Sequence, residues 1–176
     1  MEITSVQPFS LDLNFIAHTR KNHAMEHATI QMLAKRKPNQ RFSGYSIHKG
    51  FWILGDAELQ DVQKAAEIAL AKLQNGDKEL AVHPNCGTNL GVTGLCVAAA
   101  GLLTTKGLDK DDSLAERITA LTAAGMLGTL AGRYLGPNVQ AYVTTDANVQ
   151  DLAIESITLG HLRDKPAFFV KTRLEI

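Results

Sequence analysis

Hydrophobic positions near the start of the chain recur with the period of an α-helix. The segment from Leu11 to Lys37 contains no glycine or proline, and Pro38 follows it. A turn of about 100° per residue gathers one set of side chains on a single helix face. This face carries Ile16, Thr19, His23, Glu26, His27, Ile30, Leu33 and Ala34. The pattern predicts a long helix whose two histidines continue an apolar stripe and face the protein interior.

After this segment, apolar residues alternate with polar ones in some stretches and recur at helical spacing in others. Alternating apolar residues on both sides of His48-Lys49-Gly50 predict a β-hairpin. Apolar residues from Leu59 to Leu73 at helical spacing predict a second helix, and "ELAVH" at 79–83 predicts a short third strand. Two strand-like stretches, 141–160 and 167–176, then complete the sheet.

Between these parts lies a tract of apolar and small residues. There is no charged residue between Glu79 and Lys106, and a second uncharged stretch, 118–132, follows an acidic linker. Small residues are frequent in both stretches and would allow close helix packing. They are Gly91, Gly94, Ala98 and Gly101 in the first, and Ala124, Gly125, Gly128 and Gly132 in the second. The tract predicts a two-helix hairpin that is either buried in a soluble protein or embedded in lipid, since each stretch is close to or below the roughly 20 residues that cross a bilayer.

These elements predict an α+β fold in which a small mixed sheet has covering helices and is interrupted by the apolar hairpin. The 176 residues fit a single domain, 1–176, with the hairpin as an insertion at about 88–136.

Charge and cysteine content exclude some classes of protein. Eighteen basic residues balance eighteen acidic ones, and no basic run is longer than Lys35–Lys37, so we expect no nucleic-acid partner. The N-terminus has neither the basic region nor the apolar region of a signal peptide, which predicts a cytoplasmic start. The two cysteines, Cys86 and Cys96, do not indicate a disulfide framework.

The predicted first helix contains a motif typical of zinc hydrolases. His23, Glu26 and His27 form H-x-x-E-H, which places two imidazoles on one helix face beside a carboxylate. In that chemistry the histidines are metal ligands and Glu26 is the general base for hydrolysis of an amide or ester. The metal would be zinc, with iron as the alternative.

A second cluster, "HPNCGTN" at 83–89, precedes the apolar hairpin. His83 and Cys86 have H-x-x-C spacing around a proline, as in a ligand pair on a stiff turn. With His23 and His27 they would form a closed structural site, whereas His83 alone as third ligand would leave a position open for water. Glu67 and Glu79 are further candidates for the third ligand.

A different interpretation of both clusters involves no metal. Asn85, Thr88 and Asn89 could cap the apolar helix, and His83 could bind a strand end. Glu26 and the histidines could form a polar network with Arg20. The sequence leaves both interpretations open.

At "NHAMEHATI", "HPNCGTNL" and "YVTTDANVQDL" the chain resembles a family of uncharacterised bacterial membrane proteins known only as a domain of unknown function. The resemblance runs from about Asn22 to the C-terminus. It implies a soluble part that carries the H-x-x-E-H helix and is interrupted by a membrane hairpin, and it implies no established activity.

Three hypotheses of function follow. The first is a membrane-associated metal-binding protein that acts as a zinc-dependent hydrolase of the inverted-zincin type. The second is a non-catalytic accessory subunit whose hairpin packs against other subunits of a membrane complex. The third is a soluble homo-oligomer that buries the hairpin between its subunits.

The charged residues of the linker between the two hairpin helices predict on which side of a membrane the linker lies. The segment from Lys106 to Arg117 has three basic and four acidic residues, which places it outside by the positive-inside rule and the bulk of the chain on the cytoplasmic side.

Overall fold

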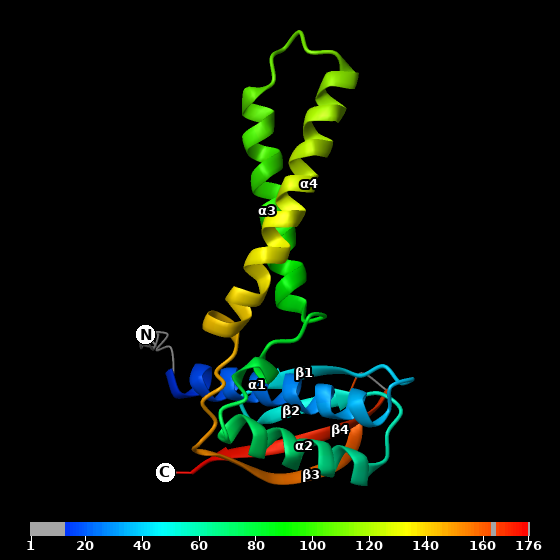
Figure 1. Ribbon diagram of the computed structural model, residues 1–176, viewed down its shortest axis with the longest axis vertical. Helices are drawn as coiled ribbons and strands as arrows, with labels where there is room; N and C mark the ends of the chain where they lie inside the picture. The colour runs from blue at the N-terminus through cyan, green and yellow to red at the C-terminus, as the bar shows by residue number, and fades with distance from the viewer. Residues whose placement is uncertain (1–12, 163–164, 176) are drawn as a thin grey trace, which may run out of the picture.

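The computed structural model describes residues 13–162 and 165–175, in which a sheet and its helices form a body and two further helices form a long stalk (Figure 1). The body contains α1 (Leu13–Arg36), β1 (Ser43–Ile47), β2 (Gly50–Leu54), α2 (Leu59–Gln74), the 3₁₀ turn η1 (Lys78–Ala81), β3 (Leu152–Leu162) and β4 (Lys165–Leu174). The stalk contains α3 (Gly87–Gly107) and α4 (Leu114–Val139), and the π-helix η2 (Gln140–Thr144) joins it back to the body.

The sheet has the strand order β1-β2-β4-β3, and all three neighbouring pairs are antiparallel. The α+β class predicted from the sequence is therefore confirmed. The described strands form no parallel pair, so the sheet is antiparallel rather than mixed. The β1–β2 hairpin turns at His48 and Lys49, as the alternation around this turn predicted.

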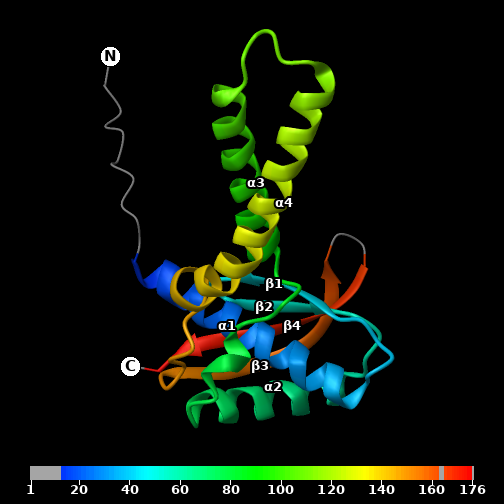
Figure 2. The same cartoon turned by 45° about the horizontal axis from the view of Figure 1, so that its top comes forward.

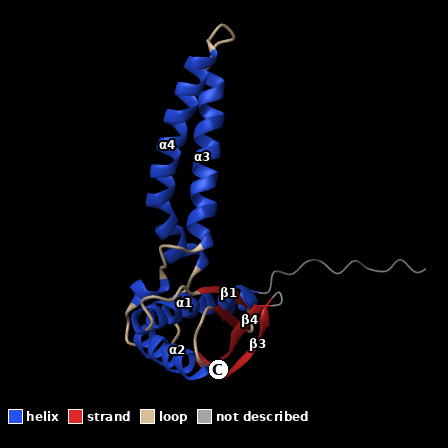
Figure 3. Ribbon diagram, turned by 90° about the vertical axis from the view of Figure 1, so that its right-hand side faces the viewer, coloured by secondary structure: helices blue, strands red, loops and turns tan. Residues whose placement is uncertain are grey.

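Both body helices cover the same face of the sheet (Figure 3). The core lies between them and this face and contains Met25 and Leu33 of α1, Phe51 of β2, Val62 of α2 and Val170 of β4. Each of these side chains is fully buried, and burying a side chain of this size stabilises a fold by about 1.5–3 kcal/mol. This layer holds α1, which carries the H-x-x-E-H motif, rigidly against the sheet.

The predicted first helix is confirmed as α1, apart from residues 11–12, which lie outside the described residues. The predicted N-terminal features at 1–12 also lie outside them. The third strand predicted at 79–83 is wrong, because Lys78–Ala81 closes into a 3₁₀ turn. Its residues Leu80 and Ala81 are buried, and the carbonyl oxygens of both accept hydrogen bonds from α1 side chains. A turn with two buried apolar residues thus produces the same short alternation as a strand.

The stalk is held together by one row of small residues on α4. Ala124, Gly128, Gly132 and Gly136 are buried against α3. A Cβ atom at Gly128 would lie 2.7 Å from Cα of Val97, so only glycine permits this approach. The glycines of α3 are not part of the contact. Outside its own helix, no atom of the described residues lies within 4 Å of a Cβ built at Gly91, Gly94 or Gly101, so the close packing comes from the small residues of α4.

The outer surface of the stalk is apolar. Exposed fractions lie between 63% and 77% for Leu90, Leu95, Leu102, Leu103, Met126, Leu127 and Leu130. Among the described residues one helix, α3, is long and apolar enough to cross a membrane. A surface of this kind needs a cover of lipid or protein.

Candidate metal centre

His23 and His27 of α1 direct the same ring nitrogen, Nε2, toward a common point. His23 Nδ1 donates a hydrogen bond to the carbonyl of Thr144 at 2.9 Å, and His27 Nδ1 donates to the carbonyl of Ala81 at 2.6 Å. Because a carbonyl oxygen only accepts, Nδ1 of each ring carries a proton, and Nε2 is the ring nitrogen that remains for a metal ion or for Cys86. Metal-ligating histidines in proteins are oriented by the same kind of hydrogen bond.

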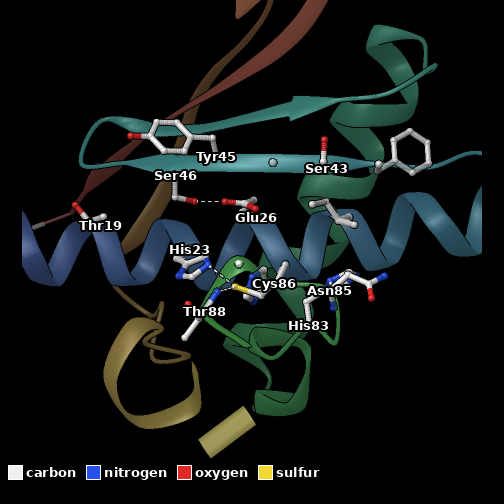
Figure 4. Close-up of a pocket in the computed structure, with 15 residues that line it drawn as sticks. Thr19, His23, Glu26, Ser43, Tyr45, Ser46, His83, Asn85, Cys86 and Thr88 are labelled. Atoms are coloured by element: carbon white, nitrogen blue, oxygen red, sulfur yellow. Dashed lines mark hydrogen bonds between the residues drawn. The ribbon is translucent and has the colours of Figure 1, made fainter. Parts of the chain in front are cut away.

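Cys86 completes the cluster from the start of α3 (Figure 4). Its sulfur lies 3.4 Å from Nε2 of His23 and accepts a hydrogen bond from the backbone N–H of Thr88 at 3.4 Å, which caps the helix. The ligand atoms of His23, His27 and Cys86 all lie within 4.8 Å of one another. Two imidazole nitrogens and one sulfur are donors that zinc prefers, and three protein ligands leave a fourth tetrahedral position open.

The electrostatics of the cluster favour a thiolate. Burial opposes ionisation of the Cys86 thiol, but hydrogen bonds with His23, His27 and Thr88 outweigh it and lower the pKa to about 5. Burial also opposes protonation of His23, yet its hydrogen bonds with Cys86 and the Thr144 carbonyl raise its pKa above the usual value. The thiolate is the form of cysteine that binds metals.

The two orienting carbonyls come from irregular backbone. Ala81 ends η1, and Thr144 ends the π-helix η2, in which the N–H of Thr145 bonds the carbonyl of Gln140 at 2.9 Å. Gln140 is fully buried and connects the loop to the stalk, because it accepts from the N–H of His83 and donates to the side chain of Asn89. The π-helix therefore both ends the stalk and fixes one ligand. Such helices occur often at functional sites.

Glu26 lies in the same pocket, on the side of β1 (Figure 4). It is 6% exposed and accepts a hydrogen bond of 2.5 Å from the hydroxyl of Ser46. Burial raises the pKa of Glu26, although the Ser46 hydroxyl and the positive charges of His27 and His23 act in the opposite direction. A Cβ atom at Gly44 would lie 2.5 Å from Cγ of Glu26, so the strand touches the carboxylate side chain directly.

The other predicted ligands are not part of this three-residue cluster. His83 lines the pocket with its ring centroid 5.7 Å from that of His27, but it is not part of the group of converging ligand atoms. Its Nδ1 accepts from the N–H of Asn85, and burial, together with His27, lowers its pKa. Glu67 and Glu79 are exposed on α2 and η1 and do not line this pocket.

The polar network expected around Arg20 takes another form. The guanidinium of Arg20 donates to the carbonyls of Tyr142, within η2, and of Thr145, which follows it, rather than to the Glu26 carboxylate. Cys86 caps α3, while Asn89 binds the carbonyls of His83 and Pro84.

Three residues around the cluster were not predicted, namely Gly44, Ser46 and Thr144. A glycine inside a strand is a signal of close backbone approach, and "SGYSI" could have shown that β1 passes close to another side chain. Thr144 acts through its backbone, which leaves no signal in the sequence.

The cluster opens into a cavity of about 360 Å³. Its walls are α1, the strand β1 and the loop that leads into α3, and they bring Glu26, His23, His27 and Cys86 to one space. The pocket thus combines three converging ligand atoms with a buried carboxylate of raised pKa.

Comparisons with known proteins show the family. A model described as "Domain of unknown function (DUF6391)" matches residues 18–157, and the chain belongs to this family. An uncharacterized protein of Picosynechococcus sp. is 34% identical, and the alignment covers 88% of this chain and 78% of that relative. No solved structure matches the chain significantly. The expected membership of an uncharacterised bacterial family of unknown function is confirmed.

Proposed function

We propose that this protein is a membrane-associated, zinc-dependent hydrolase of amide or ester bonds. The observation that carries the proposal is the convergence of Nε2 of His23, Nε2 of His27 and the Cys86 sulfur, with both imidazoles held by backbone carbonyls. This donor set matches a catalytic zinc site with three protein ligands. A bound zinc ion would supply Lewis acidity and a water of lowered pKa.

Glu26 has the properties of a general base in such a site. A base works best when its pKa lies near the working pH, and burial moves the pKa of this carboxylate upward in that direction. Glu26 would accept the proton of the attacking water and pass it to the leaving amine or alcohol. The Ser46 hydroxyl, which donates to the carboxylate, would orient it.

The stalk supports the membrane part of the proposal. Its exposed leucines and the length of α3 suit a lipid environment. In this proposal the body, with its pocket, lies on the cytoplasmic side and the linker at the tip lies on the other.

Metal content tests the proposal directly. The full chain is purified in detergent without an affinity metal, and bound metals are measured by mass spectrometry. We expect about one zinc per chain, which is lost in the variant that combines His23→Ala with His27→Ala and is reduced in Cys86→Ser. His48→Ala, in the hairpin turn outside the pocket, is the matched control and retains the metal.

Activity separates a catalytic site from a structural one. With fluorogenic ester and amide substrates, Glu26→Gln should keep its zinc and lose at least about 100-fold in turnover. Absence of metal from the native chain after zinc-replete expression would overturn the proposal and leave His23 and Cys86 as a hydrogen-bonded imidazolium–thiolate pair.

A second candidate is the accessory subunit of a membrane complex, and the outward-facing glycines of α3 favour it. Among the residues that the structure describes, no other element packs against Gly91, Gly94 or Gly101, and a partner helix could approach closely there. Loss of co-purifying subunits in Gly94→Leu, with Glu26→Gln silent, would support this function instead.

A further inference from the structure

The strand β1 forms one edge of the sheet and also one wall of the pocket. It pairs with β2 on one side, and among the described residues no strand pairs with its other side. In an antiparallel strand, alternate residues direct their N–H and C=O groups away from the partner. Four consecutive residues, Ser43–Ser46, line the pocket that contains the proposed ligands. A row of backbone donors and acceptors without a strand partner therefore borders the candidate site.

The opposite edge of the sheet is different. The strand β3 has a register irregularity between Ile154 and Ser156, and its Glu155 forms an ion pair of 2.6 Å with Lys171 of β4. Bulges and charges are the features by which proteins prevent an edge strand from pairing with other chains. In contrast, β1 reads Ser-Gly-Tyr-Ser-Ile, without charge, proline or break in register. The edge that is open to pairing is the edge beside the pocket.

We propose that the substrate is a polypeptide in extended conformation, which adds to the sheet along β1. This inference rests on the hydrolase function proposed above and names the substrate class of the same site. Strand addition supplies main-chain hydrogen bonds that do not depend on sequence, while alternate side chains enter neighbouring pockets. A peptide on this edge runs between β1 and the loop that carries Cys86, so that one of its amide bonds passes the three ligand atoms and Glu26.

The position of β1 in the molecule indicates where such a peptide would come from. Among the four strands β1 lies nearest to the root of the stalk (Figure 2). The side chain of Tyr45 is 58% exposed and belongs to the residues that line the pocket. A peptide on this edge would contact Tyr45 and would lie next to the root of the apolar stalk. A polypeptide segment close to the membrane surface fits this position.

Site-specific photo-crosslinking tests whether a polypeptide binds along β1. The zinc-loaded full chain with Glu26→Gln, which binds without turnover, receives benzoylphenylalanine in place of Tyr45 or, as control, of Leu159 on β3. Both side chains are well exposed on edge strands, at 58% and 63%. The probe is fluorescein-labelled β-casein, an unfolded polypeptide. We expect a crosslinked product from position 45 and none from position 159, together with slower amide exchange at residues 43–47 when casein is added.

A charged substitution gives an independent measurement. Ser43→Lys places a charge on the proposed edge, and Ser156→Lys places the same charge on the other edge; both serines are exposed. The first should abolish casein crosslinking at position 45 and the second should leave it unchanged.

The outcomes separate this inference from the function on which it rests. Casein that is cleaved but neither crosslinks at position 45 nor protects residues 43–47 would overturn peptide binding along β1, while the proposed hydrolase function would stand. Crosslinking without cleavage by the native chain would support peptide binding along β1 and overturn the proposed hydrolase function. A crosslink that joins two copies of this chain, unaffected by casein, would show that the edge is a subunit interface and overturn the proposal.

Discussion

The side chain of Glu26 is closely enclosed by β1. The hydroxyl of Ser46 binds its carboxylate, and the backbone of Gly44 leaves no room for a side chain next to it. A residue buried to this extent keeps a single orientation because its neighbours permit no other. The position of the proposed base is therefore set by β1, whereas the proposed ligands are set by α1 and the loop before α3.

The variant Gly44→Ala should displace the Glu26 carboxylate without displacing the proposed metal ligands. The new methyl group overlaps with Glu26, so the carboxylate must turn away from Ser46, while the hydrogen bonds of the histidines lie elsewhere. We expect the variant to retain about one zinc per chain and to lose at least about tenfold in turnover, since a misplaced base transfers protons poorly. Metal analysis and kinetics on the same preparation measure both effects.

The matched control is Gly91→Ala, one turn into α3, where an added methyl group meets nothing. It should preserve both metal and turnover. Full activity of Gly44→Ala would show that Glu26 does not act as the base.

At this scale, sequence reasoning selected residues that the structure brings to one pocket, but it could not rank them as ligands. The spacing of His23 and His27 on a helix is fixed by helix geometry, so their shared direction was predictable. The choice between His83 and Cys86 depends on how a loop turns, and spacing does not determine that. In the structure Cys86 caps α3 and faces His23, while His83 is held by the N–H of Asn85.

The elements of the fold differ in how clearly the sequence specifies them. The helix α1 and the hairpin of β1 and β2 follow periodic patterns over many residues and were predicted well. The π-helix η2 was predicted as the start of a strand, because "AYVTT" is rich in strand-forming residues. It follows directly on α4, which ends at Val139, and its last residue, Thr144, contacts His23 through the backbone carbonyl, so its conformation depends on tertiary contacts.

The helices α3 and α4 pack against each other through the row of small residues on α4, and a substitution at Gly128 tests this contact. Gly128→Leu would force its side chain into the backbone of Val97, so α3 and α4 must move apart. Overpacking of this kind costs about 1–3 kcal/mol. In a chain of this length we expect the midpoint of thermal unfolding, followed by circular dichroism in detergent, to fall by at least about 2 °C.

Gly94→Leu serves as the comparison, because it introduces the same side chain where the structure has open space. Its unfolding midpoint should match that of the native chain. An equal loss of stability in both variants would show that α3 and α4 do not pack through the row observed on α4.

In the whole molecule, the candidate site lies where the body and the stalk meet. Cys86 precedes the first residue of α3, and Thr144 ends the segment that follows α4. Because both stalk helices end at the cluster, the position of the stalk and the geometry of the ligands depend on each other. The sequence indicated an insertion, but the closeness of its two ends to the H-x-x-E-H helix appears only in three dimensions.

The dimensions of the stalk suit a bilayer. The 21 residues of α3 measure about 32 Å at 1.5 Å per residue, compared with a hydrocarbon core of about 30 Å. The uncharged part of α4 lies between Arg117 and Arg133 and is shorter. Both arginines would extend their side chains toward the headgroups, as long basic residues do near the ends of membrane helices.

A crossing stalk places its tip and the body on opposite sides of the membrane. In a background with Cys86→Ser and Cys96→Ser, a single cysteine is introduced at Asp111 in the tip or at Lys64 on α2, both exposed positions. We expect a membrane-impermeant maleimide to label position 111 in intact cells and position 64 only after permeabilisation. Labelling of both positions only after permeabilisation would contradict a crossing hairpin. Recovery of the chain without detergent as an oligomer of defined mass would instead support subunits that bury their stalks against one another.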